Sequence, residues 1–317
     1  MGRRHPLRCD GWKGRRWLPG WCPKDGAAID GELHPGDVLT KIDGQPVRNR
    51  LDELETRIAA STPQSMVNRT MQLVLSGPAD SKAKLTLRGS DGVEHYATVT
   101  RSPVNYSWLS HYRSGEVFYL MKPDVAYVDL ARLKNEEVDG MFEKFKDTKT
   151  IIMDIRGYPN GTAWNIAPRI AEESEAVAAS FRTNVVRPDV EDGIKSEEFF
   201  QRIPPAKGPR YRGKTILLID ERAISQSEHS GLFYRAANGT VFVGSATTGA
   251  NGDITGFPVP GGINIAFSGH DVRWPDGRQL QRTGLHPDIE VAPTIEGIRS
   301  GRDEVLERAV RYAAEGK

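Results

Sequence analysis

Residues 220–230 combine a candidate nucleophile with local structure that could activate it. They read Asp-Glu-Arg-Ala-Ile-Ser-Gln-Ser-Glu-His-Ser and follow residues 215–219, an apolar run typical of a strand buried on both faces. A helical pattern over residues 228–237 comes next. We therefore expect Ser225 at a strand-to-helix junction, where unpaired backbone N–H groups and the helix dipole stabilise negative charge. The stretch from Ser225 to Glu228 also fits the S-x-x-E capping box of an ordinary helix.

A second turn with chemical potential follows the apolar residues 150–155 and reads Asp-Ile-Arg-Gly-Tyr-Pro-Asn-Gly over residues 154–161. Ligands of open α/β sheets bind at the carboxyl ends of parallel strands, so we expect this turn at the same edge as Ser225. Backbone N–H groups of Gly157 and Gln226 can then converge on one oxygen atom, as an oxyanion hole requires. Alternatively, Asp154 and Arg156 pair with each other as structural ions that order the turn.

The elements that would position these turns alternate along the second half of the chain. Strand patterns at residues 125–130, 150–155 and 215–219 alternate with helical patterns at 136–146, 162–173 and 228–237. This alternation predicts an α/β core with parallel strands. Residues 241–291 contain short strands and turns, which indicate an added antiparallel portion, and a charged helix over residues 302–314 closes the chain.

The first half of the chain is expected to form a separate, smaller module. Residues 32–47 contain a Pro-Gly turn, a short strand, an Asp43-Gly44 hairpin turn and a second short strand, in the order of the PDZ signature. A helix over residues 52–61 and strands at 84–88 and 95–100 complete a PDZ-like module over residues 18–103, with an insertion at 62–79. The first strand of a PDZ groove should lie near residues 16–28, where prolines interrupt the strand pattern.

Composition limits the classes of function. A chain of 317 residues with 38% hydrophobic and 27% charged residues has room for two domains, and a net charge of +1 argues against a general nucleic-acid or membrane-surface role. No apolar stretch is long enough to span a bilayer.

Residues 1–17 form an irregular basic arm without the apolar core of a signal peptide. Cys9 and Cys22 could form one disulfide in an oxidising compartment, and the seven scattered histidines show no metal-ligand spacing.

The motifs together resemble one family. A PDZ-like module is followed by YVDL (127–130), DIRGYPNG (154–161), DERAISQSE (220–228) and GLHPDIEV (284–291). In this order they resemble the carboxy-terminal processing, or tail-specific, serine peptidases over residues 18–317.

The resemblance implies an α/β peptidase core over residues 104–317, a mixed sheet with crotonase-like ββα units, preceded by the PDZ-like α+β module. It also implies that Ser225 is the nucleophile and that Gly157 and Gln226 are the oxyanion donors. The implied substrate is unfolded or extended polypeptide, without a metal or organic cofactor, and the implied location is the bacterial periplasm or cell envelope.

One position departs from the family. Its general base is a lysine about twenty-five residues beyond the serine, kept neutral by burial so that it can accept the serine proton. The matching turn at residues 244–252 has Ala250 and Asn251 where the lysine should stand. The same turn can place the Asn251 amide and the N–H of Gly252 beside the substrate, although a left-handed turn explains these residues without chemistry.

Two histidines are candidates for a replacement base. His229 lies one helical turn beyond Ser225 and has an unperturbed pKa near 6.5. His270 is the other candidate, with Asp253 or Asp271 as its orienting carboxylate.

The predicted function is a serine endopeptidase with a non-lysine base. The missing lysine favours the alternative, a catalytically silent peptidase-fold module that binds peptide or apolar ligands. A hydrolase of non-peptide esters would use the same serine in a smaller, more apolar pocket.

Overall fold

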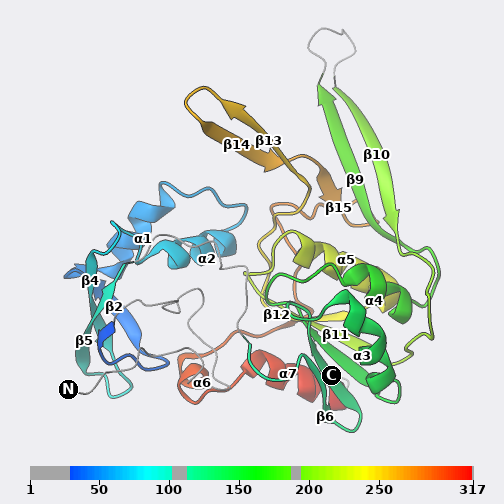
Figure 1. The fold of residues 1–317 in the computed structure, drawn as a ribbon, viewed down its shortest axis with the longest axis horizontal. Coiled ribbons are helices and arrows are strands. Elements are labelled where there is room, and N and C mark those ends of the chain that lie inside the picture. The colour runs from blue at the N-terminus through cyan, green and yellow to red at the C-terminus, as the bar shows by residue number, and fades with distance from the viewer. Residues whose placement is uncertain (1–28, 102–112, 187–193, 316–317) are drawn as a thin grey trace. The chain divides into compact units, whose positions relative to one another are not determined.

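The computed structural model describes residues 29–101, 113–186 and 194–315. The chain divides into two compact units, Met1–Glu116 with Ala292–Glu307 and Val117–Val291 with Arg308–Lys317. Four predicted features lie outside the described residues: the basic arm, the cysteine pair, the first PDZ strand and the domain boundary at residue 103. Figure 1 shows the elements of each unit.

The first unit contains a five-stranded sheet in the order β1(Ile29–Gly31), β5(Glu94–Thr100), β4(Lys82–Arg88), β2(Val38–Ile42), β3(Gln45–Pro46), with antiparallel neighbours. The predicted hairpin turn between β2 and β3 is confirmed, since Asp43 and Gly44 have φ angles of 51° and 80°. The predicted strands at 84–88 and 95–100 are confirmed as β4 and β5. A small core lies on this sheet and includes Ile42, Val74, Ala83, Leu85, Leu87, Ala97 and Val99.

The helices of this unit differ from the expectation. The helix predicted over 52–61 is α1, Val47–Glu55, and a second helix, α2, Pro63–Leu73, occupies most of the segment expected to be an insertion. The residues at the start of α2 are typical of a helix N-terminus. Thr62 is its N-cap, with Oγ1 accepting the Ser65 N–H at 3.2 Å, and Pro63 follows at the first helical position. Helix α6, Ile295–Arg299, belongs to this unit although it lies near the end of the chain.

The second unit contains a six-stranded mixed sheet in the order β16(Ile289–Glu290), β12(Val241–Gly244), β11(Lys214–Ile219), β8(Thr150–Asp154), β7(Val125–Asp129), β6(Phe118–Lys122). Strand β6 is antiparallel to β7, and the other neighbours are parallel, as predicted for the core. Every residue of β7 and β8 is buried, which explains their continuous apolar character.

Helical segments of the second unit are η3(Asn135–Glu137), α3(Val138–Phe145), α4(Ala163–Ile170) and α5(Gln226–Asn238), and α7(Glu304–Glu315) follows α6. Buried residues of α3, α4 and α5 share one apolar cluster with the central strands. The helix predicted over 162–173 ends earlier, because Ala171 has extended backbone angles. No helix in the described part of the chain is long and apolar enough to cross a membrane.

The region after α5 needs one correction. The sequence pattern predicts β12 within the antiparallel addition, but β12 pairs in parallel with β11 in the main sheet. The antiparallel portion begins later, with the hairpin β13(Ile254–Val259) and β14(Ile263–Ser268) and the strand β15(Asp271–Arg273). Strand β15 pairs with a long hairpin that the sequence patterns missed, β9(Val177–Val186) and β10(Ile194–Arg202).

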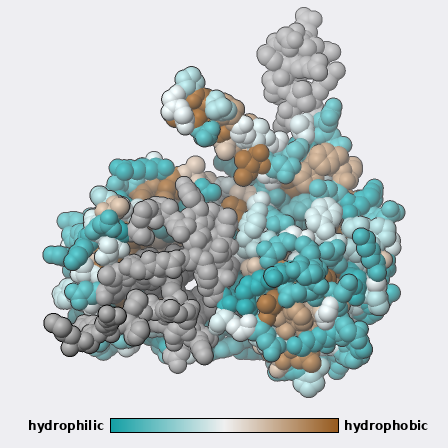
Figure 2. Space-filling model, in the orientation of Figure 1, coloured by the Kyte–Doolittle hydropathy of each residue, from teal (hydrophilic) through white to brown (hydrophobic). Residues whose placement is uncertain are grey.

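Hairpin β13–β14 exposes apolar side chains on a ribbon of two strands, visible as brown surface in Figure 2. The exposed residues are Ile254, Phe257, Ile263, Ile265 and Phe267.

Candidate active site

Ser225 lies between β11 and α5 with a strained backbone. Its φ of 52° and ψ of −113° are rare for a residue with a side chain and cost about 1–3 kcal/mol. Two hydrogen bonds hold this conformation: the Ser225 N–H donates to the Ala250 carbonyl at 2.8 Å, and the Ser225 carbonyl accepts the His229 N–H at 2.9 Å. The hydroxyl makes no capping bond to α5, so the capping-box interpretation of Ser225 is wrong.

Glu228, the third helical residue after Ser225, anchors the turn that faces Ser225. Its buried carboxylate accepts hydrogen bonds from Thr247 Oγ1 at 2.5 Å, the Gly249 N–H at 2.6 Å and the Ala250 N–H at 2.9 Å. Burial raises the pKa of Glu228 to about 7, and these hydrogen bonds limit the increase because they favour the charged form. Because Glu228 matches the S-x-x-E pattern, the sequence predicts only a helix-capping role for it and not its contacts with this turn.

The glycine turn after β8 lies against the start of α5, as the parallel pairing of β8 and β11 predicts. Ser227 Oγ donates to the Gly157 carbonyl at 2.5 Å. The Gln226 side-chain amide, oriented to satisfy its neighbours, donates to the Pro159 carbonyl at 3.0 Å and accepts the Gly161 N–H at 3.2 Å. The structure therefore brings the two predicted turns together.

The two predicted oxyanion donors differ in availability. The Gly157 N–H already donates to the Ile155 carbonyl at 2.5 Å within a tight turn. The Gln226 backbone N–H has no acceptor among the residues that the structure describes. Of the two backbone N–H groups, only that of Gln226 can donate a hydrogen bond to a substrate without first breaking another.

Asp154 and Arg156 form a buried ion pair, as the structural alternative predicted. Both side chains are fully buried, with Arg156 Nη2 at 2.7 Å from Asp154 Oδ2, and Tyr127 OH donates to the same oxygen at 2.9 Å. Aspartates at the ends of neighbouring strands make similar contacts with arginines that follow them in sequence. These pairs are Asp129 with Arg132 and Asp220 with Arg222. The arginines compensate the carboxylate charges at this edge of the sheet.

Asn251 and Gly252, the predicted substrate contacts, follow directly after Ala250, the partner of the Ser225 N–H. Asn251 is only 6% exposed, and its Oδ1 accepts the Gly252 N–H at 2.8 Å. Its Nδ2 is buried and has no partner among the described residues. Because leaving a buried amide donor unpaired is costly, Nδ2 would gain from donating to an acceptor on a substrate.

His270 is connected to the same turn through Gln281. The Gln281 side-chain amide donates to the Asn251 carbonyl at 2.6 Å and also to the His270 carbonyl. His270 Nδ1 lies 3.2 Å from Asp253 Oδ2, and the ring packs edge-on against Phe181 and Phe199. The other orienting carboxylate considered, Asp271, pairs with Arg273.

His229 lies in an aromatic cluster instead. Its Nε2 is 2.6 Å from Gln201 Oε1 of β10, and its ring packs against Trp164, Phe181 and Phe233. Burial lowers the pKa of His229 to about 4, so the ring is neutral at pH 7 and a weak proton acceptor. Within the described part of the chain, neither His229 nor His270 forms a hydrogen bond with the Ser225 hydroxyl.

Comparisons with known proteins identify the family and the fold. The profile of peptidase family S41 matches residues 124–291. Among solved structures, mature CPAF has a TM-score of 0.72 at 15% identity, over 91% of this chain and 79% of that chain. Mature CPAF complexed with lactacystin has a TM-score of 0.70 at 15% identity, over 89% and 78%.

A putative peptidase from Parabacteroides merdae has a TM-score of 0.54 at 17% identity, over 84% of this chain and 88% of its own. At such identities the likeness shows the fold alone. The search of curated proteins found no match.

Proposed function

The chain belongs to peptidase family S41, a family of serine peptidases, and we propose that it is an endopeptidase of the carboxy-terminal processing class with Ser225 as its nucleophile. The strained backbone of Ser225 carries this proposal, because the strain presents a hydroxyl that caps no helix at the carboxyl edge of the sheet. The substrate class is unfolded or extended polypeptide. Exposed apolar residues of β13 and β14 suit a substrate whose apolar side chains are also exposed.

In the proposed reaction, Ser225 Oγ attacks the scissile carbonyl carbon while a base accepts its proton. The resulting oxyanion accepts hydrogen bonds from the Gln226 N–H and from Asn251 Nδ2, the buried amide without a partner. Gly157 is a further donor on condition that its bond to Ile155 opens when substrate binds. Collapse of the intermediate expels the amine, which takes the proton from the base, and water then hydrolyses the acyl-enzyme.

For the base we favour His270 over His229. Asp253 Oδ2 lies 3.2 Å from His270 Nδ1, although the two atoms do not form a hydrogen bond in the structure. A small rotation would make Asp253 an orienting carboxylate and leave Nε2 for the serine proton. His229 has Nε2 beside Gln201 and a pKa lowered to about 4, which makes it the weaker acceptor. A water molecule between His270 and Ser225 would complete the transfer.

We further propose that the first unit is a PDZ-like module that receives an extended peptide. The antiparallel sheet, the Asp43-Gly44 turn and the Pro-Gly turn before β2 support this assignment. A pull-down with peptides that differ only in a free or amidated carboxyl end tests it, since PDZ grooves recognise the free carboxylate.

A second function, a catalytically silent module that binds peptide or apolar ligands, is favoured by two observations. In the described residues, no imidazole bonds to the Ser225 hydroxyl, and Ala250 and Asn251 occupy the turn where the family lysine is expected.

A serine-directed phosphonate and an unfolded protein substrate distinguish the two functions. We expect the phosphonate to label Ser225 and Ser225→Ala to lose both labelling and cleavage. Ser230→Ala is the matched control, because its Oγ bonds to the Gln226 carbonyl on the same helix, and it should keep both. Peptide binding without labelling or cleavage in the unmodified chain would establish the silent module. Labelling retained in Ser225→Ala would exclude Ser225 as the nucleophile.

A further inference from the structure

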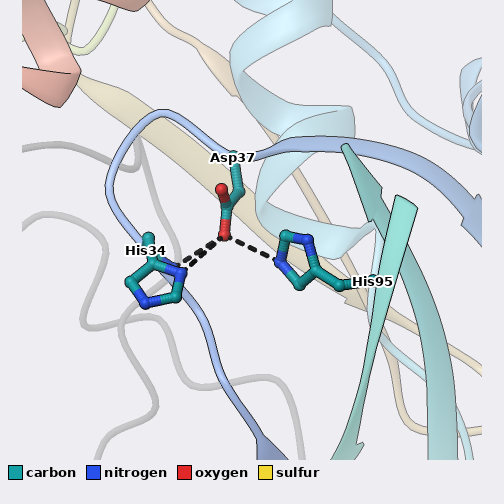
Figure 3. A group of neighbouring side chains, drawn as sticks. All are labelled: His34, Asp37 and His95. Atoms are coloured by element: carbon teal, nitrogen blue, oxygen red, sulfur yellow. Dashed lines mark hydrogen bonds and ion pairs between the residues drawn. The ribbon is translucent and has the colours of Figure 1, made fainter. Parts of the chain in front are cut away.

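Two histidines and one aspartate lie close together within the first unit. His34 lies in the loop between β1 and β2, Asp37 directly precedes β2, and His95 lies on β5. Figure 3 shows both imidazole rings directed at the same oxygen of the Asp37 carboxylate. His95 Nε2 lies 3.1 Å from Asp37 Oδ2, and His34 Nδ1 lies 3.6 Å from it. The three candidate ligand atoms all lie within 4.8 Å of one another.

We propose that His34, Asp37 and His95 bind a divalent transition metal, and that this metal is Zn²⁺. Zinc holds nitrogen and oxygen ligands at about 2.0–2.1 Å, and tetrahedral angles then set neighbouring ligand atoms roughly 3.3 Å apart. The two separations of 3.1 and 3.6 Å lie on either side of this value. A zinc ion can therefore enter with small rotations of the side chains.

The ligand types select the class of metal. Imidazole suits zinc and other first-row transition metals, whereas calcium and magnesium require sets of oxygen ligands. Two histidines and one carboxylate leave a fourth position open to water or another donor atom.

Burial gives the cluster a fixed base and an open side. The Asp37 side chain is 8% exposed, and that of His95 is 29% exposed, so their positions are constrained by packing. The His34 side chain is 62% exposed, which gives the ion an entry path.

Glu32 offers a partner for the outer nitrogen of His34. Its Oε2 lies 3.9 Å from His34 Nε2, the atom that remains free when Nδ1 binds the metal. A short movement would let this carboxylate accept the Nε2 proton, which would leave Nδ1 deprotonated for the metal. Metal binding would then tie the loop before β2 to β5.

The cluster also has an explanation without metal, which the experiment must exclude. Asp37 Oδ2 accepts the His34 backbone N–H at 2.8 Å and faces His95 Nε2 at hydrogen-bond distance. These contacts close a turn and link it to the sheet. An aspartate with this role alone would bind no zinc.

The experiment is calorimetric titration of the full chain with Zn²⁺ after removal of metal by a chelator. We expect one ion per chain, and at least about 100-fold weaker binding in both His95→Gln and Asp37→Asn, since even the loss of a residue that only supports a ligand costs 10–100-fold. X-ray absorption should find nitrogen and oxygen neighbours at about 2.0–2.1 Å. Zinc should also raise the melting temperature of the unmodified chain and leave that of His95→Gln unchanged.

Two controls separate this cluster from other zinc ligands. His286→Gln removes an exposed histidine elsewhere, and the double variant Cys9→Ser, Cys22→Ser removes both thiols; each should bind zinc as the unmodified chain does. Circular dichroism confirms that the variants are folded. The absence of stoichiometric binding, its persistence in His95→Gln, or its loss in the cysteine variant would each overturn the proposal.

Discussion

The buried Glu228 carboxylate makes a quantitative prediction about stability. Burial raises its pKa from the ordinary value of 4.5 to about 7, so the folded chain holds a proton that the unfolded chain releases between these two values. Its contribution is fully present below pH 4.5 and is lost as pH rises towards and through 7. At 1.36 kcal/mol per pKa unit, the loss is on the order of 3 kcal/mol.

The variant Glu228→Gln isolates this effect because glutamine does not titrate. Glutamine keeps one acceptor oxygen, but its NH₂ group faces one of the backbone N–H donors of the turn, which costs about 1–3 kcal/mol. At pH 4.5 the unmodified chain should therefore be the more stable by that amount. Above pH 7 the difference should vanish or reverse.

Urea unfolding of both chains at intervals from pH 4.5 to 8 measures this difference. Glu136→Gln, at an exposed position, controls for the loss of one carboxyl group. A difference between the unmodified chain and Glu228→Gln that does not change with pH would refute the raised pKa.

Three further predictions concern the site. Asn251→Leu, which removes the unpartnered Nδ2 at similar volume, should lower kcat about 10²–10³-fold with little change in KM; a change confined to KM would mean that Asn251 only binds substrate. His270→Gln should lower kcat about 10²–10⁴-fold, and His229→Gln far less, in the same peptidase assay; the reverse order would make His229 the base. Asp154→Asn removes one charge partner of the buried Arg156 and should cost about 3–5 kcal/mol in urea unfolding; a loss below about 1 kcal/mol would show that other contacts compensate the Arg156 charge.

Local patterns predicted the core because their causes are local. Residues 150–155 and 215–219 are apolar without interruption, since parallel strands with both faces covered must bury every side chain. That pattern was sufficient to predict that the glycine turn and Ser225 lie at the same edge of the sheet. The Asp43-Gly44 turn was equally readable, because few residues other than Gly, Asn and Asp adopt positive φ.

Other features had no local signal. Strand β9 of the β9–β10 hairpin pairs with β15, about ninety residues later in the chain. Glu228 matched a helix-cap pattern, and only the turn at residues 247–250 shows what its carboxylate holds.

The sequence alone therefore determined which residue types stand at the ends of the central strands, including Ser225, and the order of strands and helices that brings them together. Tertiary structure decided how each group is used. In the structure the Ser225 hydroxyl does not cap the helix, Asn251 Nδ2 has no partner among the described residues, and His95 lies beside Asp37 across 58 residues of sequence. These outcomes depend on which distant atoms compete for each hydrogen bond, and local spacing carries no information about that competition.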